Sequence, residues 1–193
     1  FKLKKNIDAT LFDMWKYNLS NTDLVHFFSC MSGSVYFCSY VKKIGMPLVV
    51  SPNLWVTLDR INQYPFDEIR NSFVLADRII GNSDMECDLL ASVFSIPREK
   101  FATVYNGIDD NFFTSIDPNI FRAHFSIDGP FVLNVANIEP RKNQISLARA
   151  MKNFPEMKLV IIGYERDSNY ANKLYQEAGD QLLYLGPVHH ESK

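Results

Sequence analysis

The chain has 193 residues, 47% of them hydrophobic, and a formal net charge of −2. It is long enough for one large domain or two modest ones, and 20 basic against 22 acidic side chains give no electrostatic footprint for nucleic acid. No apolar run reaches the roughly 18 residues of a membrane-spanning helix, and the opening residues FKLKK lack the apolar region of a signal peptide. We therefore expect a cytoplasmic protein.

The three cysteines, Cys30, Cys38 and Cys87, stand in apolar surroundings. Their spacing suits neither a disulfide framework nor a zinc site. We expect buried thiols and no metal.

The first half of the chain alternates short apolar runs with helical patterns, after an amphipathic segment around residues 11–19. Strands are expected at 24–28, 48–51, 78–82 and 101–105, and helices between 33 and 43, from 65 to 74 and from 84 onwards. Ser83 or Asp84 is the expected cap of the last helix, with Glu86 in its first turn.

Asn106-Gly107 is a strong turn signal, and residues 108–128 contain scattered turn residues without a long periodic run. We place a domain boundary here, which predicts an N-terminal domain of residues 1–107 and a C-terminal domain of residues 108–193.

The alternation restarts in the second half. Strands are expected at 131–136, 158–163 and 182–185, and helices at about 142–151, over 171–178 and from about 189. The first of these strands is apolar enough to be buried. Every crossover is long enough to join parallel strands, so both halves predict open α/β sheets with ligand sites at the carboxyl ends of the strands. Three strands are too few for an ordinary α/β domain, so we expect a piece of a longer protein.

Arg141 and Lys142 are the most informative pair. The pattern places them in the first turn of a helix, where the macrodipole disfavours cations, so a shared anion such as a diphosphate would explain them. The alternative is that both are solvated surface charges.

Five segments together resemble the retaining glycosyltransferases of family 4, also called glycosyltransferase group 1, which have two Rossmann-like domains in the GT-B arrangement. The segments are ADRIIGNS at 76–83, IPREK with VYNGID at 96–109, EPRKN at 139–143, LVIIG at 159–163 and YLGPV at 184–188. The resemblance covers about residues 76 to 191. It implies an α/β fold of two parallel-sheet domains, both incomplete in this chain.

The resemblance also implies a donor site in the second domain. Arg141 and Lys142 would hold the diphosphate of a nucleotide-sugar and neutralise the leaving nucleotide without a metal or other cofactor. Asn137 and Glu139 would join them, Gly163 would let the donor approach the backbone, and a turn with Pro187 and Val188 would line the base pocket. The alternative for the glycines at 163 and 186 is simple turn geometry. Asn106-Gly107 would be an interdomain hinge.

The first domain would receive the acceptor at the ends of its strands. The candidates are His26, Ser29, Ser32, Gly33, Asn53 and Ser83. His26 has an alternative as a core histidine bonded to a backbone carbonyl, and Ser83 as a helix cap. Many family members carry a histidine where this chain has Asn53, so a polar contact there would fall to the asparagine.

The resemblance therefore implies transfer of a sugar from a nucleotide-diphospho-sugar to a saccharide or lipid-linked acceptor in cell-surface polysaccharide synthesis. The family's spaced pair of glutamates has no counterpart here, so we expect the isolated chain to transfer poorly. A non-catalytic nucleotide- or phosphate-binding module on the same scaffold is the alternative. An NAD-type oxidoreductase is a third possibility, but this chain lacks the glycine-rich G-x-G-x-x-G motif that such an enzyme would carry after a strand. Phe1, Leu3 and the neighbouring lysines could make weak peripheral contact with the inner face of the membrane. The alternative interpretation is that this short basic segment is simply solvated.

Overall fold

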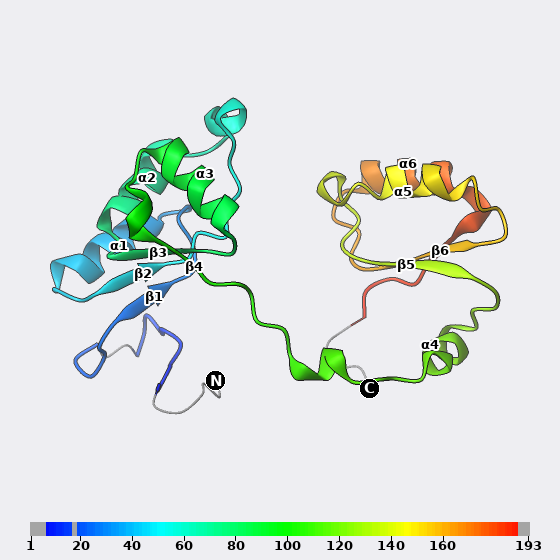
Figure 1. Cartoon of the computed structure of the whole chain (residues 1–193), viewed down its shortest axis with the longest axis horizontal. Coiled ribbons are helices and arrows are strands. Elements are labelled where there is room, and N and C mark those ends of the chain that lie inside the picture. The colour runs from blue at the N-terminus through cyan, green and yellow to red at the C-terminus, as the bar shows by residue number, and fades with distance from the viewer. Residues whose placement is uncertain (1–6, 17–18, 189–193) are drawn as a thin grey trace. The chain divides into compact units, whose positions relative to one another are not determined.

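The computed structural model describes residues 7–16 and 19–188. The chain forms two compact units, residues 1–112 and 113–193, which we call unit 1 and unit 2 (Figure 1). The units divide after Phe112, whereas the sequence places the boundary at Gly107. Residues 104–109 form no hydrogen-bonded turn, so the turn expected at Asn106-Gly107 is absent.

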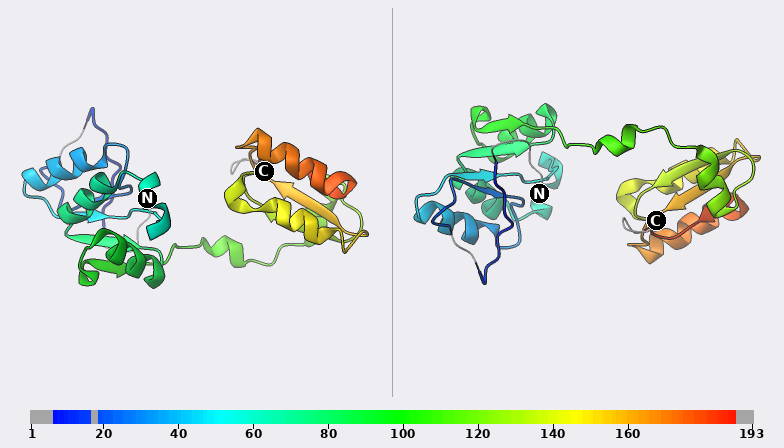
Figure 2. Two further views of the ribbon diagram at one scale, coloured as in Figure 1. Left: turned by 90° about the horizontal axis from the view of Figure 1, so that it is seen from above. Right: turned by 90° about the horizontal axis from the view of Figure 1, so that it is seen from below.

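Unit 1 is a parallel sheet of four strands in sequential order. The strands are β1 (Val25–Phe27), β2 (Leu48–Val50), β3 (Arg78–Gly81) and β4 (Phe101–Thr103). The connecting helices are α1 (Ser34–Lys43), α2 (Phe66–Leu75) and α3 (Asp84–Phe94), with 3-10 turns at Leu58–Gln63, Arg98–Lys100 and Asp110–Phe113. Because right-handed crossovers between sequential parallel strands all return on the same side, these helices cover one face of the sheet (Figures 1 and 2).

The core of unit 1 lies between that face and the helices. Strand residues that point at the helices, such as Leu48 and Ile79, are fully buried, while their neighbours on the other face are partly or fully exposed. Phe73 of α2 and Phe94 of α3 meet edge to face with ring centroids 5.3 Å apart. All three cysteines are buried and unpaired, as expected.

The amphipathic segment predicted near the N-terminus is not a helix in its described part. Leu11, Met14 and Trp15 are exposed, and only a turn forms at residues 14–16. Leu19 packs against the core, and the ring of Phe12 lies 4.9 Å from that of Phe37 on α1. Helical spacing alone is weak support for a helix in so short a segment, because isolated short helices are only marginally stable in water.

Unit 2 is a parallel sheet of three strands, again in sequential order. The strands are β5 (Phe131–Val135), β6 (Lys158–Ile162) and β7 (Leu182–Tyr184). The helices are α4 (Pro118–Phe125), α5 (Gln144–Met151) and α6 (Ser168–Ala178), with 3-10 turns at Pro140–Lys142 and Gly179–Gln181. Helices α5 and α6 cover one face, and α4 lies on the other side of β5 (Figures 1 and 2).

Strand β5 and the segment before it differ from the prediction. Strand β5 is not buried: it is an edge strand, and Leu133 and Val135 are 44% and 69% exposed. The segment after the boundary contains helix α4, which the sequence reading missed. Asp117 caps it by accepting from the Asn119 N–H, and the stacked rings of Phe121 and Phe131, 5.8 Å apart, hold it against β5.

None of the helices in residues 7–16 and 19–188 is long and apolar enough to cross a bilayer. The predicted helix from residue 189 and the basic segment 1–5 both lie outside the described residues.

Candidate functional site

The loop after β1 carries three of the predicted acceptor residues. Ser32 and Gly33 both adopt positive φ, 60° and 88°, which turns the chain sharply into α1. The Gly33 N–H donates to Oε1 of Glu68 on α2 at 2.6 Å, and Ser29 bonds within its own loop, to Met31. The loop is thus fixed to α2 by a carboxylate that the sequence did not single out.

His26 is exposed and is not a core histidine. Its Nε2 lies 2.8 Å from Oγ of Ser51, not at a backbone carbonyl, and its ring stacks on Phe28 with centroids 4.1 Å apart. The register pairs His26 with Val49, so its side chain reaches diagonally to the end of β2. Partial desolvation of the ring lowers its pKa below 6.5, which keeps the imidazole neutral near pH 7.

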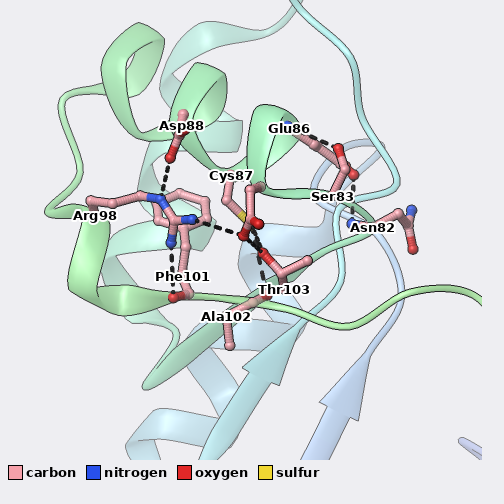
Figure 3. Close-up of polar contacts among 10 residues, drawn as sticks. Asn82, Ser83, Glu86, Cys87, Asp88, Arg98, Phe101, Ala102 and Thr103 are labelled. Atoms are coloured by element: carbon pink, nitrogen blue, oxygen red, sulfur yellow. Dashed lines mark hydrogen bonds and ion pairs between the residues drawn. The ribbon is translucent and has the colours of Figure 1, made fainter.

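The loops after β2 and β3 meet at Asn53 and Asn82, whose side chains bond through Nδ2 of Asn82 and Oδ1 of Asn53 at 3.3 Å. Ser83 is the N-cap of α3: its Oγ accepts from the Glu86 N–H at 3.1 Å, as predicted (Figure 3). The carboxylate of Glu86 accepts from the Asn82 N–H at 2.6 Å and the Leu54 N–H at 3.3 Å. The S-x-x-E spacing indicated the cap, but nothing in it indicated the contact with Leu54.

The end of β4 is tied to α3 by a second polar cluster. Arg98 pairs with Asp88 and, at 3.5 Å, with Asp84, and it donates to the carbonyl of Phe101. Asp84 also accepts from the Thr103 hydroxyl. Figure 3 labels Arg98, Asp88, Phe101 and Thr103 of this cluster. Asp84 thus holds the end of β4 directly at Thr103, and Arg98 ties the start of β4 at Phe101 to Asp88; the cluster is exposed.

Asn137, Gly163, Pro187 and Val188, four of the donor residues predicted in unit 2, line a hollow of about 220 Å³ at the carboxyl ends of β5 and β6, and Glu139 does not line it. Its lining residues are Val135, Ala136, Asn137, Ile162, Gly163, Tyr164, Pro187 and Val188. Asn137 closes one side, because its Oδ1 accepts from the Tyr164 N–H at 3.3 Å. Gly163 has φ of +149°, and a Cβ there would stand 2.1 Å from the Ala136 carbonyl oxygen.

The sequence predicted Arg141 and Lys142 in the first turn of α5, and this prediction was wrong. They form the 3-10 turn before that helix, and the left-handed Asn143 separates that turn from α5. Nη2 of Arg141 pairs with Oε1 of Glu139 at 2.7 Å, with the two side chains 77% and 22% exposed. Lys142 is exposed and pairs with no carboxylate of the described residues. Neither cation lines the hollow.

Gln144, which the sequence reading passed over, fixes the segment between β5 and α5. It is fully buried, and its Nε2 donates to the carbonyl of Asn137 at 2.8 Å. Its Oε1 has no hydrogen-bond partner among residues 7–16 and 19–188. The bond holds Asn137 at the rim of the hollow.

A wider surface groove of about 300 Å³ lies over α5 and α6, where Arg149 and Lys152 pair with Glu177. It contains none of the predicted site residues. In the part of the chain that the structure describes, no three His, Cys, Asp or Glu side chains are grouped to hold a metal ion.

Known proteins resemble this chain in both sequence and fold. The D-inositol 3-phosphate glycosyltransferase of Mycolicibacterium smegmatis is 30% identical over 125 residues, which are 60% of this chain and 29% of that protein. The enzyme of the same name from Mycobacteroides abscessus is 33% identical over 90 residues, covering 46% of this chain and 20% of that protein. The chain thus spans less than a third of the length of these curated relatives.

Solved structures show the same fold at low identity. Anabaena Alr3699/HepE in complex with UDP matches with a TM-score of 0.71 and 18% identity, over 84% of this chain and 48% of that one. WaaG, a glycosyltransferase involved in lipopolysaccharide biosynthesis, matches with a TM-score of 0.56 and 10% identity, over 81% and 52%. The two parallel-sheet units are therefore of the GT-B type, as expected.

The family model described as Glycosyltransferase Family 4 matches residues 5–112, which is more than half of the chain. It covers the strands and helices of unit 1, with the loops that carry His26, Asn53 and Ser83. The chain belongs to Glycosyltransferase Family 4.

Proposed function

We propose that this chain carries the acceptor side and the nucleotide side of a retaining glycosyltransferase. The reaction would move a sugar from a nucleotide-diphospho-sugar to a saccharide or lipid-linked acceptor in cell-surface polysaccharide synthesis. Unit 1 would receive the acceptor, and unit 2 would bind the donor. The reaction would take place on the cytoplasmic side, with weak peripheral contact to the membrane.

The hollow in unit 2 is the observation that carries the proposal. Asn137, Gly163, Pro187 and Val188, which the family resemblance selects from distant places in the sequence, line one cavity at the carboxyl ends of parallel strands. Ligands of open α/β sheets bind at that edge. The close approach of Gly163 to Ala136 leaves no room for any side chain there, so glycine is needed to keep the ends of β5 and β6 together beside the hollow.

Arg141 and Lys142 supply the positive charge that a diphosphate leaving group needs. Both are exposed on the turn that follows β5. Their role would be electrostatic: they stabilise the charge that grows on the leaving nucleotide, in place of a metal. To bind the diphosphate, Arg141 must break or share its ion pair with Glu139, in which Nη2 of Arg141 lies 2.7 Å from Oε1 of Glu139.

The comparison structures suggest UDP as the first nucleotide to test. Alr3699/HepE has been solved with UDP and with UDP-glucose. The acceptor panel should include D-inositol 3-phosphate, since that compound gives its name to the curated relatives.

Calorimetric titration of the chain with UDP, UDP-glucose and UMP tests nucleotide binding, with Lys142→Gln as the key variant. Losing one charge-assisted contact is expected to weaken UDP binding about tenfold or more, and UMP binding less. Lys173→Gln is the matched control, because Lys173 is an exposed lysine in the groove over α5 and α6. Equal affinity of both variants for UDP would overturn the role of Lys142, and absence of UDP binding would overturn UDP as the donor nucleotide.

Sugar transfer is to be measured with the full-length protein, using a panel of nucleotide-sugars and acceptors in the presence and absence of EDTA. We expect transfer that EDTA leaves unchanged, a product with the anomeric configuration of the donor, and little transfer by residues 1–193 alone. Inversion would refute the retaining mechanism. Nucleotide binding without transfer by the full-length protein would favour the non-catalytic module instead.

A further inference from the structure

Glu86 is a buried carboxylate with an unusual set of partners. It lies in the first turn of α3, is 6% exposed, and accepts two backbone N–H groups from different loops. One is Asn82, just before α3, at 2.6 Å, and the other is Leu54, in the loop after β2, at 3.3 Å (Figure 3 shows the first). One side chain thus joins the carboxyl ends of two neighbouring strands.

Helix capping alone does not explain this arrangement. In a capping box the glutamate returns to the N–H of the cap residue itself, here Ser83. Glu86 instead bonds the residue before the cap and reaches 32 positions back to Leu54. None of the ion pairs among the described residues involves Glu86, so backbone N–H groups and the N-terminus of α3 balance its charge.

Asn53, the neighbour of Leu54, is the residue that this bridge holds in place. It adopts φ of +48°, in the left-handed region, which asparagine tolerates better than most residues but which still costs free energy compared with glycine. Glu86 fixes the following N–H, at Leu54, and also the backbone of Asn82, whose side chain bonds Asn53 at 3.3 Å. Both restraints on Asn53 therefore pass through the Glu86 carboxylate.

We propose that Glu86 is a positioning residue for the acceptor: it locks the loops after β2 and β3 together and so sets the place of the Asn53 side chain. The inference rests on the proposed function, in which these strand ends receive the acceptor. Glu86 itself is buried and touches no substrate.

Glu86→Gln tests the bridge directly. The amide keeps the size of the side chain, but it offers one acceptor oxygen and turns an NH₂ group toward the second N–H. Asp77→Asn is the matched control, because Asp77 accepts from the Leu48 N–H at 2.7 Å and from Lys42, at the opposite end of β2. Both variants lose the same kind of bond, but only one loses it beside Asn53.

Amide hydrogen exchange of residues 1–193, read by NMR, is the first measurement. With Glu86→Gln we expect exchange at Leu54 to rise about tenfold or more while core amides in β2 keep their protection. With Asp77→Asn, Leu54 should be unchanged. Unchanged exchange at Leu54 in Glu86→Gln, or equal loss of protection throughout unit 1, would overturn the bridge.

Steady-state kinetics of the full-length protein are the second measurement, with UDP-glucose and D-inositol 3-phosphate as the first pair of substrates. Glu86→Gln should raise the acceptor KM about threefold to tenfold and leave the donor KM unchanged, and Asp77→Asn should change neither. An unchanged acceptor KM would overturn the positioning role. If no acceptor is used at all, the proposed function fails, and the exchange experiment still decides whether Glu86 holds the loops.

Discussion

Gly163 lies directly against the carbonyl of Ala136, where the chain leaves β6 beside the end of β5. A Cβ at Gly163 would stand 2.1 Å from the Ala136 oxygen and 2.5 Å from its carbon, and φ is +149°. The Gly163 N–H donates to the Gly186 carbonyl at 3.0 Å, and the Ala136 N–H to Ile162 at 2.9 Å. These bonds hold the three strand ends close together, which leaves room for hydrogen alone at this position.

Gly163→Ala should therefore destabilise unit 2 by about 3 kcal/mol or more, since the added methyl group has to push backbone apart. Gly129→Ala is the control: Gly129 also has positive φ, +74°, but a Cβ there meets nothing within 4 Å. This control should lower the free energy of unfolding by about 1 kcal/mol, because only the backbone conformation disfavours alanine there. Urea unfolding measures both. Equal losses in the two variants would show that conformation, and not the contact with Ala136, requires glycine.

The thiols offer a test of the core of unit 1. Burial raises the pKa of Cys30 to about 12 and that of Cys38 to about 11. At pH 8 neither forms the reactive thiolate. We expect no reaction of these two cysteines with a thiol reagent in the native chain and full reaction in denaturant. Fast labelling of Cys30 or Cys38 in the native chain would mean that α1 does not pack on the sheet as described.

The sequence was informative wherever a local pattern decides the structure. Short β-branched runs separated by helical patterns predicted the parallel strands, and a capping residue with Glu86 in the first turn predicted the start of α3 at Ser83 or Asp84, since both depend on neighbours in the chain. Asp117 and Pro118 also carry a local signal, an N-cap followed by proline at the first helical position, and α4 could have been predicted from it.

Other features depend on distant parts of the chain, and no local pattern indicates them. The exposure of Val135 follows from the position of β5 at the edge of its sheet, which is set by pairing with β6 alone. The bond from Leu54 to Glu86 spans 32 positions and depends on how the ends of β2 and β3 meet. The turn at Arg141 was misplaced because Asn143, in the left-handed conformation, interrupts a segment whose periodicity looks continuous.

His26 should make the stability of unit 1 depend on pH below neutrality. Its pKa is lowered in the folded chain by desolvation, so the unfolded chain binds more protons between that value and 6.5. Stability is therefore full above pH 6.5 and falls as the pH drops through this window. An NMR titration of the imidazole measures the pKa.

Two variants separate the causes of this shift. Ser51→Ala removes the hydrogen bond to Nε2 and should leave the pKa lowered, because desolvation is its cause. Phe28→Ala removes the stacked ring, 4.1 Å away, and should bring the pKa back toward 6.5. If Ser51→Ala restores the pKa and Phe28→Ala does not, the hydrogen bond and not burial sets it.

The pair of Arg141 and Glu139 gives the last prediction. Arg141 is 77% exposed, so the ion pair contributes little to stability, between about 0 and 1 kcal/mol. Glu139→Gln keeps an oxygen that can accept from Arg141 but removes the negative charge next to the proposed diphosphate site. We expect the melting temperature to stay the same and the affinity for UDP to rise about twofold to tenfold, with a steeper dependence on salt because one repulsion is gone. Arg141→Gln in the same background should cancel the gain. Weaker UDP binding by Glu139→Gln would show instead that the carboxylate contacts the nucleotide itself and does not act through Arg141.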